Sequence, residues 1–336
     1  MMGKRLGKQS ILFDSPLSIA STASVVGPKE GEGPLSEYFD LILPDTLNGA
    51  KSWEQAEAEM VRKALDLAIK KAGLTFADID FIISGDLLDQ NIGTTFGIKD
   101  FARPLFGIFS ACSTIGEAMI LGSVILDAGC AQNVLIGASS HFSAAEKQFR
   151  NPLNLGGQRP PTSTWTVTGD GAAVLSKTGK GPYVMRATVG KIIDMGITDA
   201  NNMGAAMAPA AVDSLVTHFR DFNLTPDYYD LIITGDLGYI GKEIVLRMVK
   251  EDGYDLTANY TDCGIKIFDR YTQDTHSGGS GCACSAVTFA GYLYKKLKNN
   301  ELKKLLFVPT GALLSPTSSQ QKLPIPGIAH AIGIEM

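Results

Sequence analysis

Charged side chains are scarce in this sequence: Asp, Glu, Lys and Arg make up 19% of its 336 residues, against 45% hydrophobic residues. A disordered chain has the opposite balance, so this chain has enough apolar material for a buried core. The net charge is −5, and no run of Lys and Arg is long enough to form a basic surface. We therefore expect no nucleic acid among its partners, because phosphate backbones are bound through such surfaces.

A long hydrophobic run is also missing. The longest apolar stretches, such as residues 118–126, are interrupted and fall short of the roughly 20 residues that span a bilayer. The basic residues Lys4, Arg5 and Lys8 are followed by a mixed segment rather than an unbroken apolar stretch, so we expect no signal peptide. Any membrane association is then expected to be peripheral.

Cysteine is sparse, with five residues, an odd number that favours reduced thiols in a cytosolic-type compartment. Cys263, His276, Cys282 and Cys284 lack the paired Cys-x-x-Cys spacing of structural zinc sites, so we expect no metal. The Gly-rich residues 278–281 lack the Lys-Ser/Thr of a phosphate-binding loop and the acidic ribose partner of a dinucleotide site. We therefore expect no cofactor either.

An internal repeat is the clearest pattern in the chain. Residues 72–87 reappear as residues 222–237, 150 positions later, as a turn followed by an apolar run that ends in Gly-Asp. An amphipathic stretch precedes each copy, over residues 53–71 and 208–220. Each copy therefore predicts a helix that leads into a buried strand.

A second pair of similar segments supports the duplication. Residues 110–113 and 282–285 are each followed by a helical pattern and a short apolar strand, with an offset of 172 positions. Helices that alternate with fully apolar strands predict parallel sheets covered on both faces. We expect two α/β halves, residues 1–180 and 181–336, related by a pseudo-twofold axis and joined by a Gly-rich connection.

Cys112 lies where one of these helices is predicted to begin. Thr114 and Glu117 have the spacing of a capping box, and helical periodicity follows them. Free backbone N–H groups and the positive end of the helix dipole favour a thiolate at such a place. We therefore predict that Cys112 is the most reactive of the five cysteines. The alternative interpretation is a buried, unreactive thiol.

These features resemble those of a known superfamily. The segment at Cys112, the Thr-Gly-Asp-Gly motif at residues 168–173, the strand at residues 230–234 and the loop at residues 276–281 occur in the order seen in thiolases and ketoacyl synthases. The resemblance covers nearly the whole chain. It implies a thiolase-like α/β fold, in which two pseudo-twofold-related halves form a layered αβαβα core.

Within that superfamily, residues 203–211, 278–285 and 311–316 resemble the stage V sporulation protein AD family. That resemblance implies a sporulation protein that binds dipicolinic acid, a pyridine dicarboxylate, or its calcium chelate, and supports its uptake into the developing spore. It also implies stage V sporulation membrane proteins as partners and a place in the forespore or spore, soluble or peripherally attached to the inner spore membrane. The broader resemblance to thiolase-fold proteins, which pair through the sheet of the N-terminal half, implies a homodimer.

The catalytic residues of the superfamily carry over only in part. Cys112 matches the nucleophile, and His276 resembles the histidine of the thiolase Gly-His-Pro loop. Where ketoacyl synthases have a histidine and thiolases an asparagine, this chain has Gly235 and Asp236, and the second thiolase cysteine is missing from residues 308–312. Condensation needs an acid/base partner for the thiol and donors for a developing oxyanion, which a carboxylate would repel. The resemblance therefore implies a binding role.

Two other functions stay open at this point. One is an active acyltransferase or ketoacyl-synthase-type enzyme, with Cys112 as nucleophile and His276 or His141 as base. The other is a scaffold whose pocket is vestigial.

Contacts to a ligand are predicted from several segments. His141 follows a strand at the kind of sheet end where ligands collect. A long connection carries arginines whose guanidinium groups could clamp carboxylates, and the Gly-rich loop lets the backbone approach a pocket. The predicted ligand-binding residues are Cys112, His141, Arg150, Gln158, Arg159, Asp236, Gly279 and Ser280.

Overall fold

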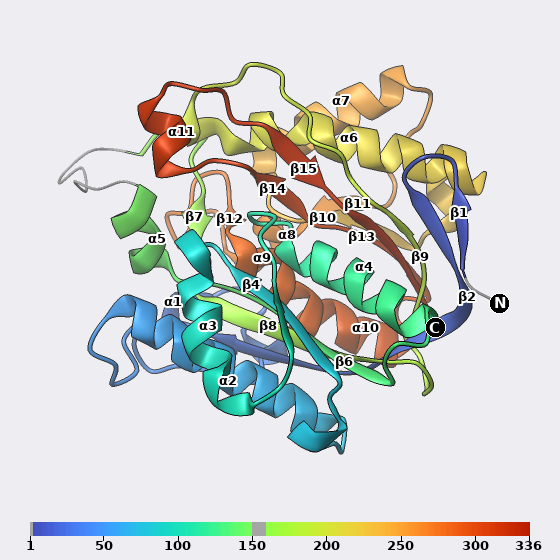
Figure 1. Cartoon of the computed structure of the whole chain (residues 1–336). Coiled ribbons are helices and arrows are strands. Elements are labelled where there is room, and N and C mark those ends of the chain that lie inside the picture. Colours follow the sequence, from blue (N-terminus) through green and yellow to red (C-terminus); the bar gives the residue numbers. More distant parts are fainter. Residues whose placement is uncertain (1–2, 150–158) are drawn as a thin grey trace.

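Helices and strands alternate along nearly the whole chain (Figure 1). The computed structural model describes residues 3–149 and 159–336. The first half of the chain contains the strands β1 (Lys4–Leu6), β2 (Ser10–Val26), β3 (Leu41–Ile42), β4 (Phe81–Asp86), β5 (Leu105–Gly107), β6 (Asn133–Ser140), β7 (Trp165–Thr166) and β8 (Gly169–Ser176). Its helices are α1 (Pro28–Gly31), α2 (Trp53–Lys71), α3 (Ile92–Ile98), α4 (Thr114–Asp127) and α5 (Phe142–Phe149).

The second half has the same alternation. Its strands are β9 (Tyr183–Thr188), β10 (Leu231–Thr234), β11 (Tyr260–Asp262), β12 (Gly279–Ser280), β13 (Lys304–Val308), β14 (Thr310–Ala312), β15 (Gly327–Ala329) and β16 (Ala331–Glu335). Its helices are α6 (Met203–Phe222), α7 (Gly238–Glu251), α8 (Cys263–Ile267), α9 (Cys282–Val287), α10 (Tyr294–Lys298) and α11 (Pro316–Gln320), with a π-helical stretch, Thr288–Leu293, between α9 and α10. No helix in the described residues is long and apolar enough to cross a membrane.

The order of the strands in the main sheet is itself duplicated. Its path is β11-β10-β13-β16-β9-β2-β8-β6-β4-β5, with β1 and β3 added beside β2. Outward from the central β2–β9 pair, β8 matches β16, β6 matches β13, β4 matches β10 and β5 matches β11. The antiparallel and parallel pairings follow the same order on both sides. This is the pseudo-twofold relation that the repeat predicts.

The prediction of purely parallel sheets is wrong for the inner strands. β4, β5 and β6 are parallel, as are β10, β11 and β13, but β8 and β16 run antiparallel to their neighbours. An unbroken apolar run shows that both faces of a strand are covered and carries no signal for its direction. The predicted boundary at residue 180 falls in the connection between β8 and β9.

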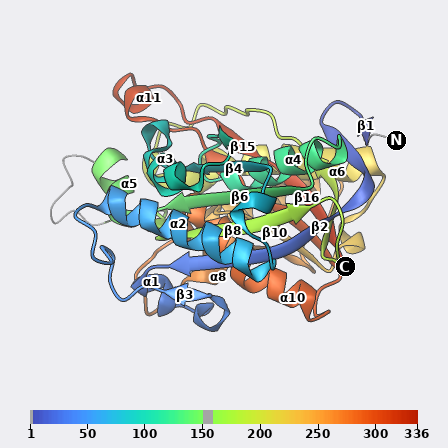
Figure 2. The same cartoon turned by 60° about the horizontal axis from the view of Figure 1, so that its bottom comes forward.

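The helices lie in layers on either side of the sheet halves (Figure 1). α2 packs on β2, β6 and β8 from outside, as Figure 2 also shows. α6 and α7 pack against each other on the outer side of the second half, and α4 and α9 pack together between the two halves. The thiolase-like fold, with its layered αβαβα core, is confirmed.

The two copies of the sequence repeat form matching structure. A helix leads through a short 3-10 turn into a buried strand in each, as predicted, although α6 begins five residues before the amphipathic stretch. Asp80 accepts hydrogen bonds from the backbone N–H groups of residues 132 and 133, where β6 begins. Asp230 accepts them from residues 303 and 304, where β13 begins. The repeated aspartate therefore fixes the start of the neighbouring strand in both halves.

A row of acidic side chains is buried under α2. Asp86, Ser139 and Asp170 are register neighbours on β4, β6 and β8, and all are fully buried. Direct cross-strand neighbours share a face of the sheet. Glu57 of α2 accepts a hydrogen bond from Ser139 Oγ at 2.8 Å, which places its carboxyl against this row. We refer to Glu57, Asp86 and Asp170 as the acidic row.

The acidic row has few partners for its charge. Both carboxyl oxygens of Asp170 and Oε2 of Glu57 have no hydrogen-bond partner in the described structure. Burial first, and the neighbouring carboxyls second, raise the pKa of Glu57 and of Asp170 well above their usual range. Burial also raises the pKa of Asp86. The fold therefore favours the protonated form of these groups.

Candidate functional site

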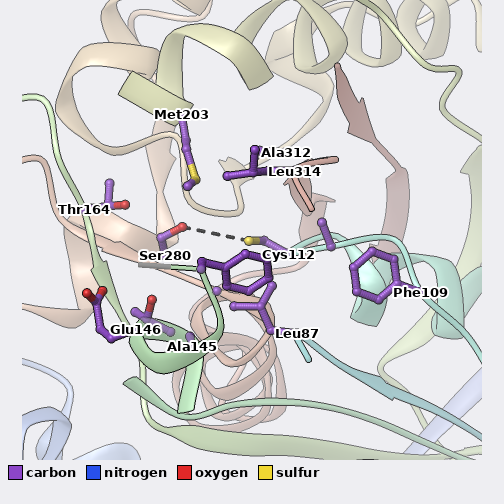
Figure 3. A pocket seen from close by; sticks show the side chains of 14 residues that line it. Leu87, Phe109, Cys112, Ala145, Glu146, Thr164, Met203, Ser280, Ala312 and Leu314 are labelled. Carbon is purple, nitrogen blue, oxygen red and sulfur yellow. Dashed lines mark hydrogen bonds between the residues drawn. The ribbon is translucent and has the colours of Figure 1, made fainter. Parts of the chain in front are cut away.

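A hollow of about 590 Å³ opens above Cys112, where segments from the two halves of the chain meet (Figure 3). Cys112 and Ser280 approach each other at its floor, and Met203 reaches toward them from another wall in the same view. The described lining is mostly apolar, with side chains such as Leu87, Phe109 and Leu314. The arrangement forms a concave, largely apolar pocket of the kind that holds small ligands.

Cys112 is placed by a strained turn before α4. Ala111 has a φ of 46°, in the left-handed region that side-chain-bearing residues seldom occupy. Gly85 allows this segment to pass close to β4, because a Cβ there would lie 2.1 Å from the carbonyl oxygen of Ile108. The cysteine is thereby presented at the pocket floor with 5% of its surface exposed.

The predicted capping box at this turn is wrong. Helix α4 begins at Thr114, and the side chain of its N-cap, Ser113, makes no capping hydrogen bond. Thr114 Oγ1 instead donates to the carbonyl oxygen of Ala111 at 2.6 Å, which stabilises the turn itself. Glu117 Oε2 is buried without a hydrogen-bond partner in the described structure. The residue types are those of a capping box, but the turn uses them differently.

The pocket floor is a chain of hydrogen bonds. Cys112 Sγ lies 3.9 Å from Ser280 Oγ, and Ser280 Oγ donates to Asp236 Oδ2 at 2.6 Å. Thr310 Oγ1 donates to Asp236 Oδ1 at 2.7 Å, and the N–H of Gly281 donates to Oδ2 at 3.3 Å. Asp236 is 1% exposed, so it lies beneath the floor and one hydrogen bond away from the pocket.

The thiol of Cys112 is not activated as the sequence predicts. Burial, followed by the charge of Asp236, raises its pKa well above the usual range. A helix start contributes about 0.3–1 kcal/mol toward an anion, whereas full burial shifts a pKa by up to about 3–5 units. Cys130 is the exposed cysteine, while Cys112 and the other three are buried. The prediction that Cys112 is the most reactive thiol therefore has no support in this geometry.

The two histidines considered as bases do not line the described pocket. His141 Nε2 donates to the carbonyl oxygen of Thr46 at 2.8 Å, and its Nδ1 accepts from the N–H of Ala144 at 3.4 Å. Burial lowers the pKa of His141, which keeps the ring neutral. His276 Nδ1 bonds the carbonyl oxygen of Pro160 at 3.0 Å, and its Nε2 lies 3.0 Å from Asp274 Oδ1. Both rings are thus engaged in holding loops.

The predicted carboxylate clamp is only partly visible. Arg150 and Gln158 lie outside the described residues. Arg159 Nη2 donates to the backbone oxygen of Asp274 at 2.6 Å and to its carboxylate at 3.0 Å. The guanidinium of Arg159 also stacks over Trp165, 4.9 Å from the ring centroid. Arg159 does not line the pocket, and it would have to leave Asp274 to bind a ligand there.

The Gly-rich loop contributes to the site as expected of its glycines. Gly279 pairs with Trp165 in a short two-stranded sheet, and Gly281 has a φ of 94° and lines the pocket beside Ser280. A Cβ on Gly281 would lie 2.7 Å from Ser140 Oγ, so the loop can sit this close to β6 only with glycine.

Most of the lining was not predicted from the sequence. Met203 and Leu314 lie within two of the three segments that carry the resemblance to the sporulation family, residues 203–211 and 311–316, and this was the one signal that could have indicated them. Thr166 of β7 and Thr164, directly before that strand, both line the pocket. The position of these two threonines could not be predicted from the sequence, because β7 is only two residues long and its described pairing is with the distant Gly-rich loop.

The described lining contains no Lys, Arg or His side chain that could serve as a base or cation; Glu146 is its one charged residue. Its polar side chains are mainly hydroxyl groups, from Thr164, Thr166 and Ser280. No group of three or more His, Cys, Asp or Glu within residues 3–149 and 159–336 could hold a metal ion. The geometry therefore suits holding a ligand better than activating a thiol for acyl transfer.

Comparison with known proteins places the chain in a family. The family model for stage V sporulation protein AD (SpoVAD) matches residues 7–335 of this chain. Stage V sporulation protein AD of Bacillus subtilis (strain 168) is 45% identical over 332 residues, which cover 99% of this chain and 98% of that protein.

Solved structures with the same fold are condensing enzymes of low sequence identity. A variant of OleA from Xanthomonas campestris has a TM-score of 0.61 at 14% identity, over 97% of this chain and 99% of that one. 3-Oxoacyl-(acyl-carrier-protein) synthase III from Aquifex aeolicus VF5 has a TM-score of 0.58 at 11% identity, over 95% and 100% of the two chains. These similarities show the fold alone. The chain has a condensing-enzyme-like fold and belongs to the stage V sporulation protein AD family.

Proposed function

We propose that this protein binds dipicolinic acid, free or as its calcium chelate, in the pocket above Cys112 and supports its uptake into the developing spore. The observation that carries the proposal is a pocket at the condensing-enzyme position whose described lining is apolar and hydroxyl-rich and holds no Lys, Arg or His side chain. The 45% identity to a stage V sporulation protein supports a role in sporulation.

The pocket walls suit a planar aromatic ring. Leu87, Phe109 and Met203 offer apolar surface, and the hydroxyl groups of Thr164 and Thr166 can donate to carboxylates. The contacts proposed for Arg150 and Gln158 lie outside the described residues, and they remain part of the proposal. Asp236 lies below the floor, so we place the ligand carboxylates away from it.

Binding is tested by calorimetry and thermal melting with dipicolinate. A ligand at about a hundredfold excess over its Kd stabilises the folded state by roughly 2.7 kcal/mol. We expect Leu314→Trp, which fills the pocket, to abolish the calorimetric signal and the melting shift, while Leu323→Trp, at a 49% exposed site outside the described lining, keeps both. Benzoate, with one carboxylate and no ring nitrogen, should stabilise the protein much less.

Incubation with acetyl coenzyme A tests the alternative function, acyl transfer. If the protein is an acyl-transfer enzyme, mass spectrometry of the intact chain will show an acetyl group added at Cys112, and Cys112→Ala will lose it. That adduct, together with no dipicolinate-dependent stabilisation, would replace the binding role by the enzymatic one. A calcium series alongside the dipicolinate titration separates the free acid from its chelate.

We also propose that the protein forms a homodimer, acts with stage V sporulation membrane proteins and resides in the forespore or spore. β5 supports the dimer, because it ends the path of the main sheet and exposes Leu105 and Phe106 by 40% and 49%. An apolar edge strand of this kind is a site for pairing with another chain.

Light scattering tests the dimer. We expect a mass near twice the 35.8 kDa of one chain, and a shift to the monomer for Phe106→Lys, since a charge on an edge strand opposes pairing. Tyr271→Lys, at a 90% exposed position in the other half, is the matched control. A wild-type mass of one chain at micromolar concentration would exclude the dimer.

A further inference from the structure

Hydrogen positions on the pocket floor follow from its donors and acceptors. Oδ1 of Asp236 accepts from Thr310 Oγ1, and Oδ2 accepts from Ser280 Oγ and from the N–H of Gly281. A serine hydroxyl has one hydrogen to donate, and the 2.6 Å contact of Ser280 Oγ with Asp236 Oδ2 is much shorter than its 3.9 Å contact with Cys112 Sγ. The single hydroxyl hydrogen of Ser280 is therefore committed to Asp236.

Because Ser280 donates its hydrogen to Asp236, it can only accept in its contact with Cys112. Ser280 Oγ has only lone pairs left to offer to Cys112, 3.9 Å away. The contact is thus favourable when the sulfur carries its hydrogen and donates it, and a thiolate would face two acceptors in succession. We propose that Asp236, acting through Ser280, is a positioning residue that holds Cys112 as a protonated thiol, so that this cysteine serves the pocket as a neutral surface and not as a nucleophile.

The repeat shows that Asp236 is free for this role. Its counterpart Asp86 holds the turn after β4, because it accepts from the N–H groups of Leu88 at 3.0 Å and Thr94 at 2.7 Å. In the second half, Asp262 of β11 holds the turn after β10 and accepts from the N–H groups of Leu237 and Gly238, both at 3.0 Å. The same Gly-Asp sequence therefore fixes a turn in one half and faces the pocket floor in the other.

The described pocket lining holds no Lys, Arg or His side chain that would oppose this effect. The thiol of Cys282 donates to the carbonyl oxygen of Ala111 at 3.0 Å, and that of Cys284 donates to the carbonyl oxygen of Gly235 at 3.5 Å. His330 bonds Ser110 and the N–H of Gly190 through its two ring nitrogens, and Glu146 adds a further carboxyl to the lining. None of these supplies the cation or base that lowers the pKa of a reactive cysteine.

Alkylation kinetics test the proposal without any ligand, so the result is separate from that of dipicolinate binding. Iodoacetamide labelling of Cys112, mapped by peptide mass spectrometry across a pH series, is normalised to the exposed Cys130 in the same molecule. We expect Asp236→Asn to raise the relative rate at pH 8 about tenfold or more, the change in thiolate that one pKa unit gives. The midpoint of the pH profile should move down with it.

Asp170→Asn is the control, because it also removes a fully buried carboxyl but not one that contacts the floor. It should leave the ratio of Cys112 to Cys130 labelling unchanged. An unchanged ratio and midpoint in Asp236→Asn would overturn the proposal, as would an equal rise in both variants.

An infrared measurement on the unaltered protein covers the case in which Asp236→Asn does not fold. The difference spectrum between the wild type and Cys112→Ala at pH 9 should contain an S–H stretching band, at a frequency lowered by hydrogen bonding to Ser280. Ser280→Ala should return that band to the frequency of a free thiol. A difference spectrum without an S–H band means that Cys112 is ionised and excludes the proposal.

Discussion

Replacing Gly171 with alanine is expected to destabilise the protein by about 3 kcal/mol or more, at or beyond the upper end of the usual cost of overpacking a core. A Cβ on Gly171 would lie 2.2 Å from the carbonyl carbon of Ala286, 2.4 Å from its oxygen and 2.6 Å from the nitrogen of Val287. These are backbone atoms of α9, which no side-chain rotation can move. Strand β8 and α9 would have to separate.

Denaturant titration measures this effect, and Gly107→Ala is its control. Gly107 lies on β5, where the nearest atom to an added Cβ is Asn91 Nδ2 at 3.5 Å, an ordinary contact. We expect the midpoint to fall strongly for Gly171→Ala and to change little for Gly107→Ala. Equal midpoints would show that α9 can shift without cost. Because α9 begins at Cys282, directly after the pocket residues Ser280 and Gly281, the same variant should also weaken ligand binding.

Gly171 belongs to a motif that the sequence identifies only by resemblance. The Thr-Gly-Asp-Gly segment is recognisable without any physical reason for its residues. The structure supplies two: Gly171 permits the close approach of α9, and Asp170 joins the acidic row. Neither reason could be derived beforehand, because both depend on residues that are distant in the sequence: Ala286 for Gly171, and Glu57 and Asp86 for Asp170.

The fold was more predictable than the site because it is encoded twice. The two copies of the repeat each contain a helix, a turn and a strand, so the secondary structure predicted for one copy can be checked against the other. The antiparallel direction of β8 and β16 was missed, since burial on both faces gives the same apolar run in either direction.

The site depends on differences between the copies. Asp86 and Asp236 both follow a glycine at the same place in the repeat, yet only Asp236 reaches the pocket floor, because Asp262 holds the turn in its half. Cys112 was placed correctly near a helix start, but its reactivity was predicted from that local feature alone. Burial and Asp236 have the larger effect, and both are tertiary.

Alkaline pH is expected to unfold the protein through its buried carboxyls. A carboxyl whose folded pKa is raised stabilises the fold fully below its unfolded pKa of about 4, and loses that contribution as the pH rises through the folded pKa. Glu30 and Asp262, with pKa values raised to about 7 by burial, lose theirs first. The acidic row follows, since the pKa of Glu57 and of Asp170 is raised well above its usual range.

The size of the alkaline effect comes from the number of carboxyls that titrate together. Each unit by which folding raises one pKa is worth about 1.4 kcal/mol once that group ionises. Ionising one member of the acidic row also raises the cost of ionising the next, because their charges act on one another through the interior and no cation of the described structure lies against Glu57 or Asp170. The melting temperature should therefore fall by several degrees between pH 6 and pH 9, and further above it.

Asp170→Asn separates the acidic row from the other groups. It removes the carboxyl with two unpartnered oxygens while keeping its shape, so its melting temperature should depend less on pH above pH 7 than that of the wild type. Asp252→Asn removes one exposed charge at the end of α7 and should keep the wild-type slope. Parallel melting curves for all three proteins from pH 6 to pH 10 would mean that Asp170 is already ionised in the folded state, with its charge balanced by a group that the row does not contain.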